Sequence, residues 1–237
     1  MNANTVLEVK DLTKYYGKLK ALDALTMALP SGRVIGLLGE NGCGKSTLFK
    51  VLAGVTSNYE GEVRIAGLPV GPESKAVVSF LPDVSFLTDS WRISYCADLY
   101  ADFFADFNRP KFDELILFFQ LDATSKLSEL SKGMREKVQV ALAMSRDAQV
   151  FLLDEPISGV DPAARDVILQ AIVRDLHPES LVLISTHLIH DLEPILDGAV
   201  FMRQGRVLLA GDVDDLRAQH GKSIDELFRE VYRWSPR

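Results

Sequence analysis

Hydrophobic and polar residues alternate in the first part of the chain, and continuous apolar runs follow. The alternation over Val6–Leu12 and Ala24–Leu29 predicts two strands, each with one buried face. The run Val34–Leu38 stands between glycines and predicts a strand buried on both faces, which is typical of a parallel sheet. Further strands are expected at Glu62–Ala66 and Ala76–Leu81.

Helical spacing replaces this alternation near Val84. Residues 85–130 contain ten of the twenty aromatic residues of the chain, at intervals closer to helical than to alternating. We therefore expect a helical insertion with a small core of its own, within a helical subdomain over about 85–145. These aromatic side chains either all pack that core, or some of them line a groove that receives a partner.

Helices and strands alternate in the second half of the chain, and this order predicts an α/β fold with a largely parallel sheet. Two β-like runs flank the turn at Gln204-Gly205, and two amphipathic helices are expected over 212–237. The helices and strands expected here are Ser131–Arg146, Val150–Leu153, Pro162–Leu176, Leu181–Ser185, Ala199–Arg203 and Arg206–Ala210, in addition to an earlier helix at Lys45–Ala53.

The composition narrows the class of protein. The length predicts a single domain, 1–237. The net charge of −7 gives no indication of a nucleic-acid partner. The longest run without a charged residue is 180–190, shorter than the roughly 20 residues of a membrane-spanning helix, so we expect no span. The N-terminal residues lack the pattern of a signal peptide. Cys43 and Cys96 have no metal-ligand spacing, which favours reduced thiols in the cytosol.

A glycine-rich segment between a predicted buried strand and a predicted helix matches the phosphate-loop pattern G-x-x-x-x-G-K-[ST]. Glycines allow backbone N–H groups to turn toward phosphate oxygens, and the helix N-terminus adds the positive end of its dipole. Lys45 is expected to place its charge on the β- and γ-phosphates, and Ser46 its hydroxyl on Mg²⁺. The expected nucleotide-binding residues are Gly39, Asn41, Gly42, Cys43, Gly44, Lys45, Ser46 and Thr47.

Two carboxylates follow the apolar strand at 150–153. Ligands bind at the carboxyl edge of parallel sheets, which is where these residues should lie. Mg²⁺ prefers carboxylate and phosphate oxygens, so Asp154 is expected to serve as a metal ligand. Glu155 is expected to face the attacking water as a general base or to polarise it.

Four further segments occur in a characteristic order: Tyr16 before Gly17, Leu130–Met134, Ser158–Asp161, and His187 after a predicted strand. With the two motifs above, they make the chain resemble the ATP-binding subunit of ABC transporters over about Val6 to Gly211. The resemblance implies a phosphate-loop NTPase fold: a mixed, largely parallel sheet core, an N-terminal antiparallel β subdomain and a helical insertion subdomain. It also implies ATP and Mg²⁺ as cofactors.

The resemblance assigns a role to each segment. Ser131 and Gly133 would meet the γ-phosphate of ATP bound by a second subunit, and Tyr16 would stack on adenine. His187 would hydrogen-bond the γ-phosphate and help to orient water, while the loop at Asp161 would contact the opposite active site. Other roles stay open for the same residues: helix capping for Ser131 and Asp161, and ordinary packing for the ring side chains.

Two positions depart from the common pattern of the family. Asp83 replaces the usual glutamine; it offers Mg²⁺ a carboxylate in place of an amide. The segment Leu130–Met134 resembles the family's signature loop and is called the signature segment here. It has Lys132 and Met134 where glycine and glutamine are commoner, and it keeps Ser131 and Gly133. This variant resembles the ATPases of ABC-2-type exporters and favours export. Alkylation of Cys43, at a variable position of the loop, is expected to block ATP binding.

These observations predict an ATPase subunit that dimerises around ATP and powers a separate membrane-spanning subunit. It would be cytoplasmic and peripheral on the inner face of the cell membrane, paired with a second ATPase subunit as a homodimer or a heterodimer. A soluble ABC-type ATPase with a role such as cofactor assembly is the alternative. A nucleotide sensor without turnover is a third hypothesis, which the presence of Glu155 and His187 disfavours.

Overall fold

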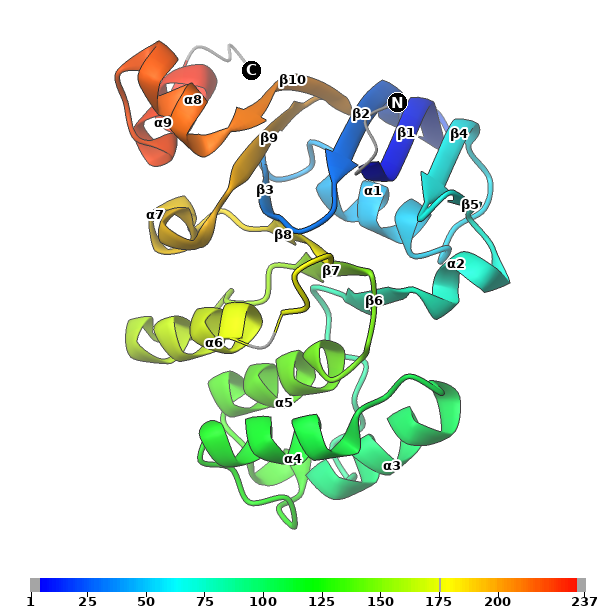
Figure 1. Cartoon of the computed structure of the whole chain (residues 1–237), viewed down its shortest axis with the longest axis vertical. Coiled ribbons are helices and arrows are strands. Elements are labelled where there is room, and N and C mark those ends of the chain that lie inside the picture. The colour runs from blue at the N-terminus through cyan, green and yellow to red at the C-terminus, as the bar shows by residue number, and fades with distance from the viewer. Residues whose placement is uncertain (1–4, 175, 234–237) are drawn as a thin grey trace.

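Two β-sheets lie at the centre of the fold (Figure 1). The computed structural model describes residues 5–174 and 176–233. In that part of the chain, one sheet is antiparallel with strand order β2-β1-β4-β5, and the other has the order β10-β9-β3-β8-β7-β6. The first consists of β1 (Thr5–Tyr16), β2 (Leu19–Pro30), β4 (Glu60–Ile65) and β5 (Leu68–Pro69). The second consists of β3 (Val34–Leu38), β6 (Val78–Leu81), β7 (Val150–Asp154), β8 (Leu181–Ser185), β9 (Gly198–Arg203) and β10 (Arg206–Asp212).

The second sheet is parallel except at one edge, where β10 runs antiparallel to β9. Every residue of β3, β7 and β8 is buried, which explains their continuous apolar runs. Ser185 of β8 pairs with Leu37 of β3 on one side and with Asp154 of β7 on the other. The loops that follow these three strands therefore begin at the same edge of the sheet.

Helices surround this sheet, and its two faces belong to different hydrophobic clusters. Leu152 and Leu183 join the cluster that contains α1 (Lys45–Leu52) and the antiparallel sheet, whereas Leu153 and Ile184 join the cluster that contains the helices between β6 and β7 and the C-terminal helices. Neighbouring residues of one strand thus enter opposite cores, as the two-residue period of a strand requires. The helices are α1 (Lys45–Leu52), α2 (Pro72–Ala76), α3 (Ile93–Phe103), α4 (Arg109–Phe118), α5 (Lys132–Met144), α6 (Pro162–Arg174), α7 (Ile189–Leu192), α8 (Val213–His220) and α9 (Ile224–Arg233), with 3₁₀ turns at Leu127–Glu129 and Glu193–Ile195.

The predicted fold class and the order of the main elements are confirmed. β1 and β2 are longer than the alternation indicated, with 12 residues each. The strand predicted from Ala76 begins at Val78, because Pro72 starts a short helix that includes Ala76. The end of the helix predicted to reach Leu176 includes Asp175, which lies outside the described residues.

The helical lobe, formed by α3, α4 and α5, lies at the end of the molecule away from the antiparallel sheet (Figure 1). Arg146, which is 4% exposed, joins the lobe to the sheet just after α5. Its guanidinium donates to Asp106 Oδ1 at 2.6 Å and to the Ala76 carbonyl at 3.0 Å, and it stacks 3.9 Å from the centre of the Phe104 ring. None of the helices in the described ranges is long and apolar enough to cross a bilayer.

Replacing Arg146 with methionine should destabilise the protein strongly, because the partly buried Asp106 carboxylate and the backbone carbonyl oxygens of Ala76 and Val78 lose a buried donor. We expect a loss of about 3 kcal/mol or more in the free energy of unfolding, measured by urea titration. The control is Arg229→Met, which removes a 70% exposed arginine from a surface pair with Asp225 and should cost less than about 1 kcal/mol. Equal losses in the two variants would contradict the role of Arg146.

Candidate functional site

The phosphate loop joins β3 to α1 and presents backbone groups and one lysine. Gly44 immediately precedes α1 at φ 112°, and a Cβ atom there would lie 2.6 Å from the Ala21 carbonyl oxygen. Only glycine combines that conformation with such a close approach. Lys45 is 6% exposed, and its ammonium donates to the Gly39 carbonyl at 2.7 Å and the Glu40 carbonyl at 3.2 Å. The loop therefore holds a buried cation next to the N-terminus of a helix.

Gly39 and Cys43 form the rear of this loop. A Cβ atom on Gly39 would lie 2.5 Å from Cys43 Sγ and 2.6 Å from the Met202 carbonyl oxygen. The Cys43 side chain is 7% exposed, and burial raises the pKa of its thiol, so the reactive thiolate is disfavoured. Its carbonyl accepts a hydrogen bond from Gly205 N–H at 2.8 Å. Alkylation of Cys43 therefore requires a change in the packing around the thiol, which lies against Gly39.

Asp154 ends β7 with a carboxylate that is almost fully enclosed, since the residue is 2% exposed. The Ser185 hydroxyl donates to Oδ1, and Oδ2 has no hydrogen-bond partner among the described residues. Burial raises the pKa of Asp154, while the Ser185 and Ser46 hydroxyls act in the opposite direction. An unpaired buried carboxylate oxygen near a serine hydroxyl is a donor set that fits Mg²⁺, which takes hard oxygen ligands.

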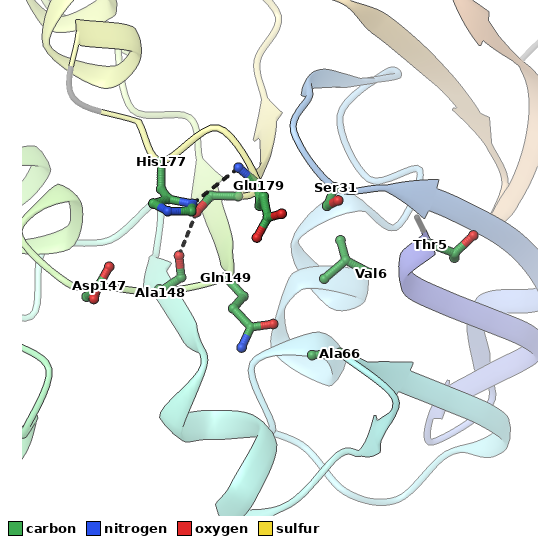
Figure 2. Close-up of a pocket in the computed structure, with 10 residues that line it drawn as sticks. Thr5, Val6, Ser31, Ala66, Asp147, Ala148, Gln149, His177 and Glu179 are labelled. Atoms are coloured by element: carbon green, nitrogen blue, oxygen red, sulfur yellow. Dashed lines mark hydrogen bonds between the residues drawn. The ribbon is translucent and has the colours of Figure 1, made fainter. Parts of the chain in front are cut away.

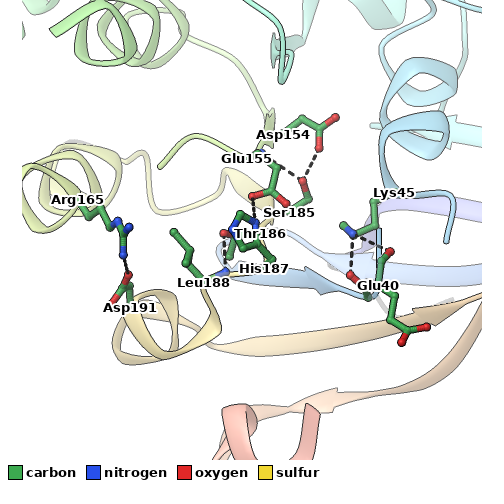
Figure 3. A network of polar contacts seen from close by, with 11 residues as sticks. Glu40, Lys45, Asp154, Glu155, Arg165, Ser185, Thr186, His187, Leu188 and Asp191 are labelled. Atoms are coloured by element: carbon green, nitrogen blue, oxygen red, sulfur yellow. Dashed lines mark hydrogen bonds and ion pairs between the residues drawn. The ribbon is translucent and has the colours of Figure 1, made fainter. Parts of the chain in front are cut away.

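Glu155 and His187 contact each other beside this carboxylate (Figure 3). Glu155 has a φ of 55°, which is uncommon outside glycine, and its N–H donates to the Ser185 carbonyl at 3.0 Å. His187 Nδ1 lies 3.0 Å from Glu155 Oε2. An ionised carboxylate can only accept, so Nδ1 carries the hydrogen in this contact. In this tautomer Nε2 is an acceptor, so His187 must release Glu155 before Nε2 can donate to a phosphate.

A cavity of about 490 Å³ collects most of the residues predicted for the site. Tyr16, which is 46% exposed, and Asp83 both line it. Asn41, Gly42, Gly44, Lys45, Ser46, Thr47, Asp154 and Glu155 also contribute to the lining. Gly39, Cys43, Ser131, Gly133 and His187 are not part of the lining, although His187 contacts Glu155.

Five lining residues were not predicted: Leu19, Lys20, Ala21, Gln204 and Gly205. The first three begin strand β2, and the last two form the β9–β10 connection; both segments are distant in sequence from the phosphate loop. Asp23 N–H of β2 donates to the Gly205 carbonyl at 3.0 Å and so links β2 to the β9–β10 connection. Of these five residues, only Gln204 and Gly205 had a local sequence signal, and that signal indicated a turn and not a ligand site.

The signature and Asp161 segments have capping roles of their own. The Ser131 hydroxyl accepts from Met134 N–H at 3.3 Å at the start of α5, and Asp161 Oδ1 accepts from Ala164 N–H at 3.1 Å at the start of α6. Arg165 donates to Asp191 at 2.7 Å and to the Val160 carbonyl at 2.9 Å. This ion pair fixes the Asp161 segment against the helix that follows His187 (Figure 3).

A second cavity, of about 600 Å³, lies at the opposite edge of the sheet, where β7 and β8 begin (Figure 2). Its lining includes Asp147, Gln149, His177 and Glu179. Within the described residues, buried side-chain polar atoms without a hydrogen-bond partner occur in Asp106, Gln139 and Asp154. None of these three residues lines this cavity. The cavity is the larger of the two, but the candidate chemistry lies at the Asp154 edge.

A phosphate loop with its lysine, followed at the same sheet edge by a buried aspartate and a glutamate, defines a nucleoside-triphosphate hydrolase of the phosphate-loop class. Comparison with known proteins narrows this class. The family model for the ABC transporter matches residues 22–158, more than half of the chain. The chain therefore belongs to the ABC transporter family, as an ATP-binding subunit that hydrolyses ATP.

Relatives of the chain include exporters and importers. Nod factor export ATP-binding protein I of Rhizobium etli is 28% identical over 98% of this chain and 75% of its own length. Ribose import ATP-binding protein RbsA 2 of Rhizobium meliloti is 31% identical over 96% of this chain and 48% of its own length. A solved ATP-binding subunit of an ABC transporter has 30% identity and a TM-score of 0.85, covering 96% of this chain and 99% of that one.

Replacing Asp154 with asparagine should stabilise the nucleotide-free protein while abolishing hydrolysis. The raised pKa means that the ionised carboxylate is disfavoured in the folded state, and asparagine removes that charge but can still accept from Ser185. We expect a melting temperature higher by about 2–4 °C at neutral pH, the shift that 1 kcal/mol gives in a domain of this size.

The sign of the pH dependence follows from the raised pKa. Wild-type stability is favoured while Asp154 is protonated and declines as the pH rises through the raised pKa, so the gap between the proteins should narrow toward acid. Asp214→Asn, at a side chain 96% exposed, is the control and should change neither property. A melting temperature of Asp154→Asn below that of wild type would contradict the prediction.

Proposed function

We propose that two copies of this chain, or one copy and a related subunit, close around two ATP molecules and power a membrane-spanning exporter subunit. Each site would combine the Lys45 loop of one subunit with the Ser131 segment of the other. The proposal is carried by one observation: Ser131 is exposed and lies outside the cavity of its own chain. A second subunit can supply that hydroxyl and the N-terminal end of α5 to the outer side of the cavity.

Within each site, Lys45 would neutralise charge on the β- and γ-phosphates, and Tyr16 would stack on the adenine at the cavity rim. The 46% exposure of Tyr16 leaves a ring face available. Asp154 and Ser46 would hold Mg²⁺, and Asp83 would approach it from the end of β6. Bound Mg²⁺ would neutralise charge that develops on the phosphates during hydrolysis.

Glu155 would orient and polarise the attacking water, because its carboxylate lies at the cavity one residue beyond the proposed metal ligand. The His187 ring contacts one Glu155 oxygen through Nδ1. Movement of His187 toward the γ-phosphate would free that oxygen for water. Hydrolysis would then wait for ATP to be bound, which supports coupling between nucleotide and conformation.

The membrane-spanning partner would dock on the 83–107 segment of the helical lobe. Most aromatic residues of the lobe pack its core, including the fully buried Phe112. Phe103, however, is 78% exposed and Val84 is 69% exposed, with Phe86 and Tyr95 also exposed. Exposed apolar side chains grouped on one segment are typical of a protein interface. This partner would hold the chain at the cytoplasmic face of the membrane, and the export relatives favour export.

The Glu155→Gln variant should bind ATP and remain as a closed dimer, because the site is intact but hydrolysis is blocked. Light scattering with Mg²⁺ and ATP should give twice the monomer mass, and without ATP the monomer mass. Adding Gly133→Glu to Glu155→Gln places a negative charge opposite the γ-phosphate and should restore the monomer while ATP still binds. A double variant that still dimerises with ATP would contradict the proposed composite site.

Phe103→Ser should release the chain from washed membranes without changing the ATPase activity of the purified protein. The matched control is Leu117→Ser, at an equally exposed residue on α4 outside the docking segment. The measurement is the fraction of the chain that sediments with membranes of cells expressing it with its membrane subunit. If wild type stays in the supernatant, the soluble ATPase alternative replaces the transport role.

A further inference from the structure

The C-terminal helix α9 is fixed at its start by a buried carboxylate. Glu193, 8% exposed, accepts from Ile224 N–H at 3.0 Å and Asp225 N–H at 3.2 Å, and also from Arg217 at 2.7 Å. Burial raises the pKa of Glu193, but these donors outweigh it and leave the pKa below its ordinary value. The carboxylate therefore stays ionised near neutral pH and holds the N-terminus of α9 in place.

The other end of α9 reaches β9. The Tyr232 hydroxyl donates to the Met202 carbonyl at 2.7 Å, and Tyr232 is 8% exposed. The centroid of its ring lies 4.4 Å from that of the Phe228 ring. The Phe228 centroid lies 6.5 Å from that of Phe201 on β9. Burial raises the pKa of the Tyr232 phenol, and the nearby Cys43 and Glu40 raise it further, so the hydroxyl remains a donor at neutral pH.

The Met202 carbonyl also forms the floor of the phosphate loop. The last parallel pair between β3 and β9 joins Leu38 to Phe201, so Met202 lies just beyond the pairing, where the loop begins. Its oxygen would be only 2.6 Å from a Cβ atom on Gly39, so the oxygen and the glycine are packed in direct contact. Gly205, in the turn between β9 and β10, donates its N–H to the Cys43 carbonyl.

We propose that Tyr232 is a positioning residue for ATP binding: it acts through the Met202 carbonyl to hold the phosphate loop in its nucleotide-binding conformation. A hydroxyl that fixes the orientation of this carbonyl also fixes the surface on which Gly39 rests, and Gly39 in turn packs against Cys43 Sγ. Without it, the loop samples other conformations, and the apparent affinity for ATP falls by the fraction that remains competent. The α9 helix thus belongs to the support of the nucleotide site, although it does not line the cavity.

Tyr232→Phe removes the donor and keeps the ring. We expect the dissociation constant for ATP, measured by calorimetry, to rise by about two- to tenfold, the range that one neutral hydrogen bond supports. The KM for ATP should rise by a similar factor with a smaller change in kcat, since no group at the γ-phosphate is altered. Tyr59→Phe, at a half-buried tyrosine that precedes β4, is the matched control and should leave both constants unchanged.

A second readout separates loop support from general loss of stability. Cys43 and Cys96 are both buried, but only Cys43 packs against Gly39, the residue that also packs against the Met202 carbonyl oxygen. Alkylation by N-ethylmaleimide, followed by mass spectrometry, should become several-fold faster at Cys43 in Tyr232→Phe and stay unchanged at Cys96. An equal increase at both cysteines would mean that the variant is merely less stable and would overturn the proposal.

Because this role rests on the proposed placement of ATP on the Lys45 loop, Lys45→Ala is measured in parallel. If Lys45→Ala abolishes ATP binding while Tyr232→Phe binds like wild type with unchanged Cys43 alkylation, the positioning role fails and the site stands. If Lys45→Ala binds ATP like wild type, the placement of the nucleotide itself is wrong.

Discussion

The parallel pairing of β3, β8 and β7 is the constraint on which the site depends. Ser185 pairs with Leu37 on one neighbour and with Asp154 on the other. That register places the start of the phosphate loop, the strand-end carboxylate and the segment leading to His187 at one edge. A shift of one residue in β7 would turn Asp154 to the opposite face of the sheet and remove it from the Ser185 hydroxyl. Strand registry, more than any single contact, thus determines where the chemistry lies.

The same edge concentrates groups that are costly to bury. Among the described residues, the Lys45 ammonium hydrogen-bonds to backbone carbonyls alone, one Asp154 carboxylate oxygen has no hydrogen-bond partner, and Glu155 has a left-handed backbone conformation. Within this part of the chain, Lys45 forms no ion pair with Asp154 or Glu155. Well-buried strands on both sides hold them in place, and a ligand that carries both negative phosphates and a cation would satisfy them together.

How much the sequence predicts depends on the range of the interactions. The phosphate loop and the Asp154–Glu155 pair follow from local patterns, because each motif lies directly after a buried strand with its own apolar signature. The roles of Leu19 and Gln204 in the cavity have no local signature, since they arise when the start of β2 meets the β9–β10 connection. Tyr232 was predicted only as part of an amphipathic helix; its contact with Met202 spans 30 residues of sequence. The thiol of Cys43 likewise turned out to be a packing group at the rear of the loop.

Asp83 lies between the candidate nucleotide site and the helical lobe. It lines the cavity beside Lys45 and Asp154, and it also borders a third cavity, of about 470 Å³, formed with Glu136 and Gln139 of α5. Burial raises the pKa of Glu136 to about 7, and the Gln139 Oε1 atom is buried without a partner within the described residues. The end of β6 therefore meets α5 through polar groups that are incompletely satisfied, in contrast to the rigid Arg146 clamp at the other end of that helix.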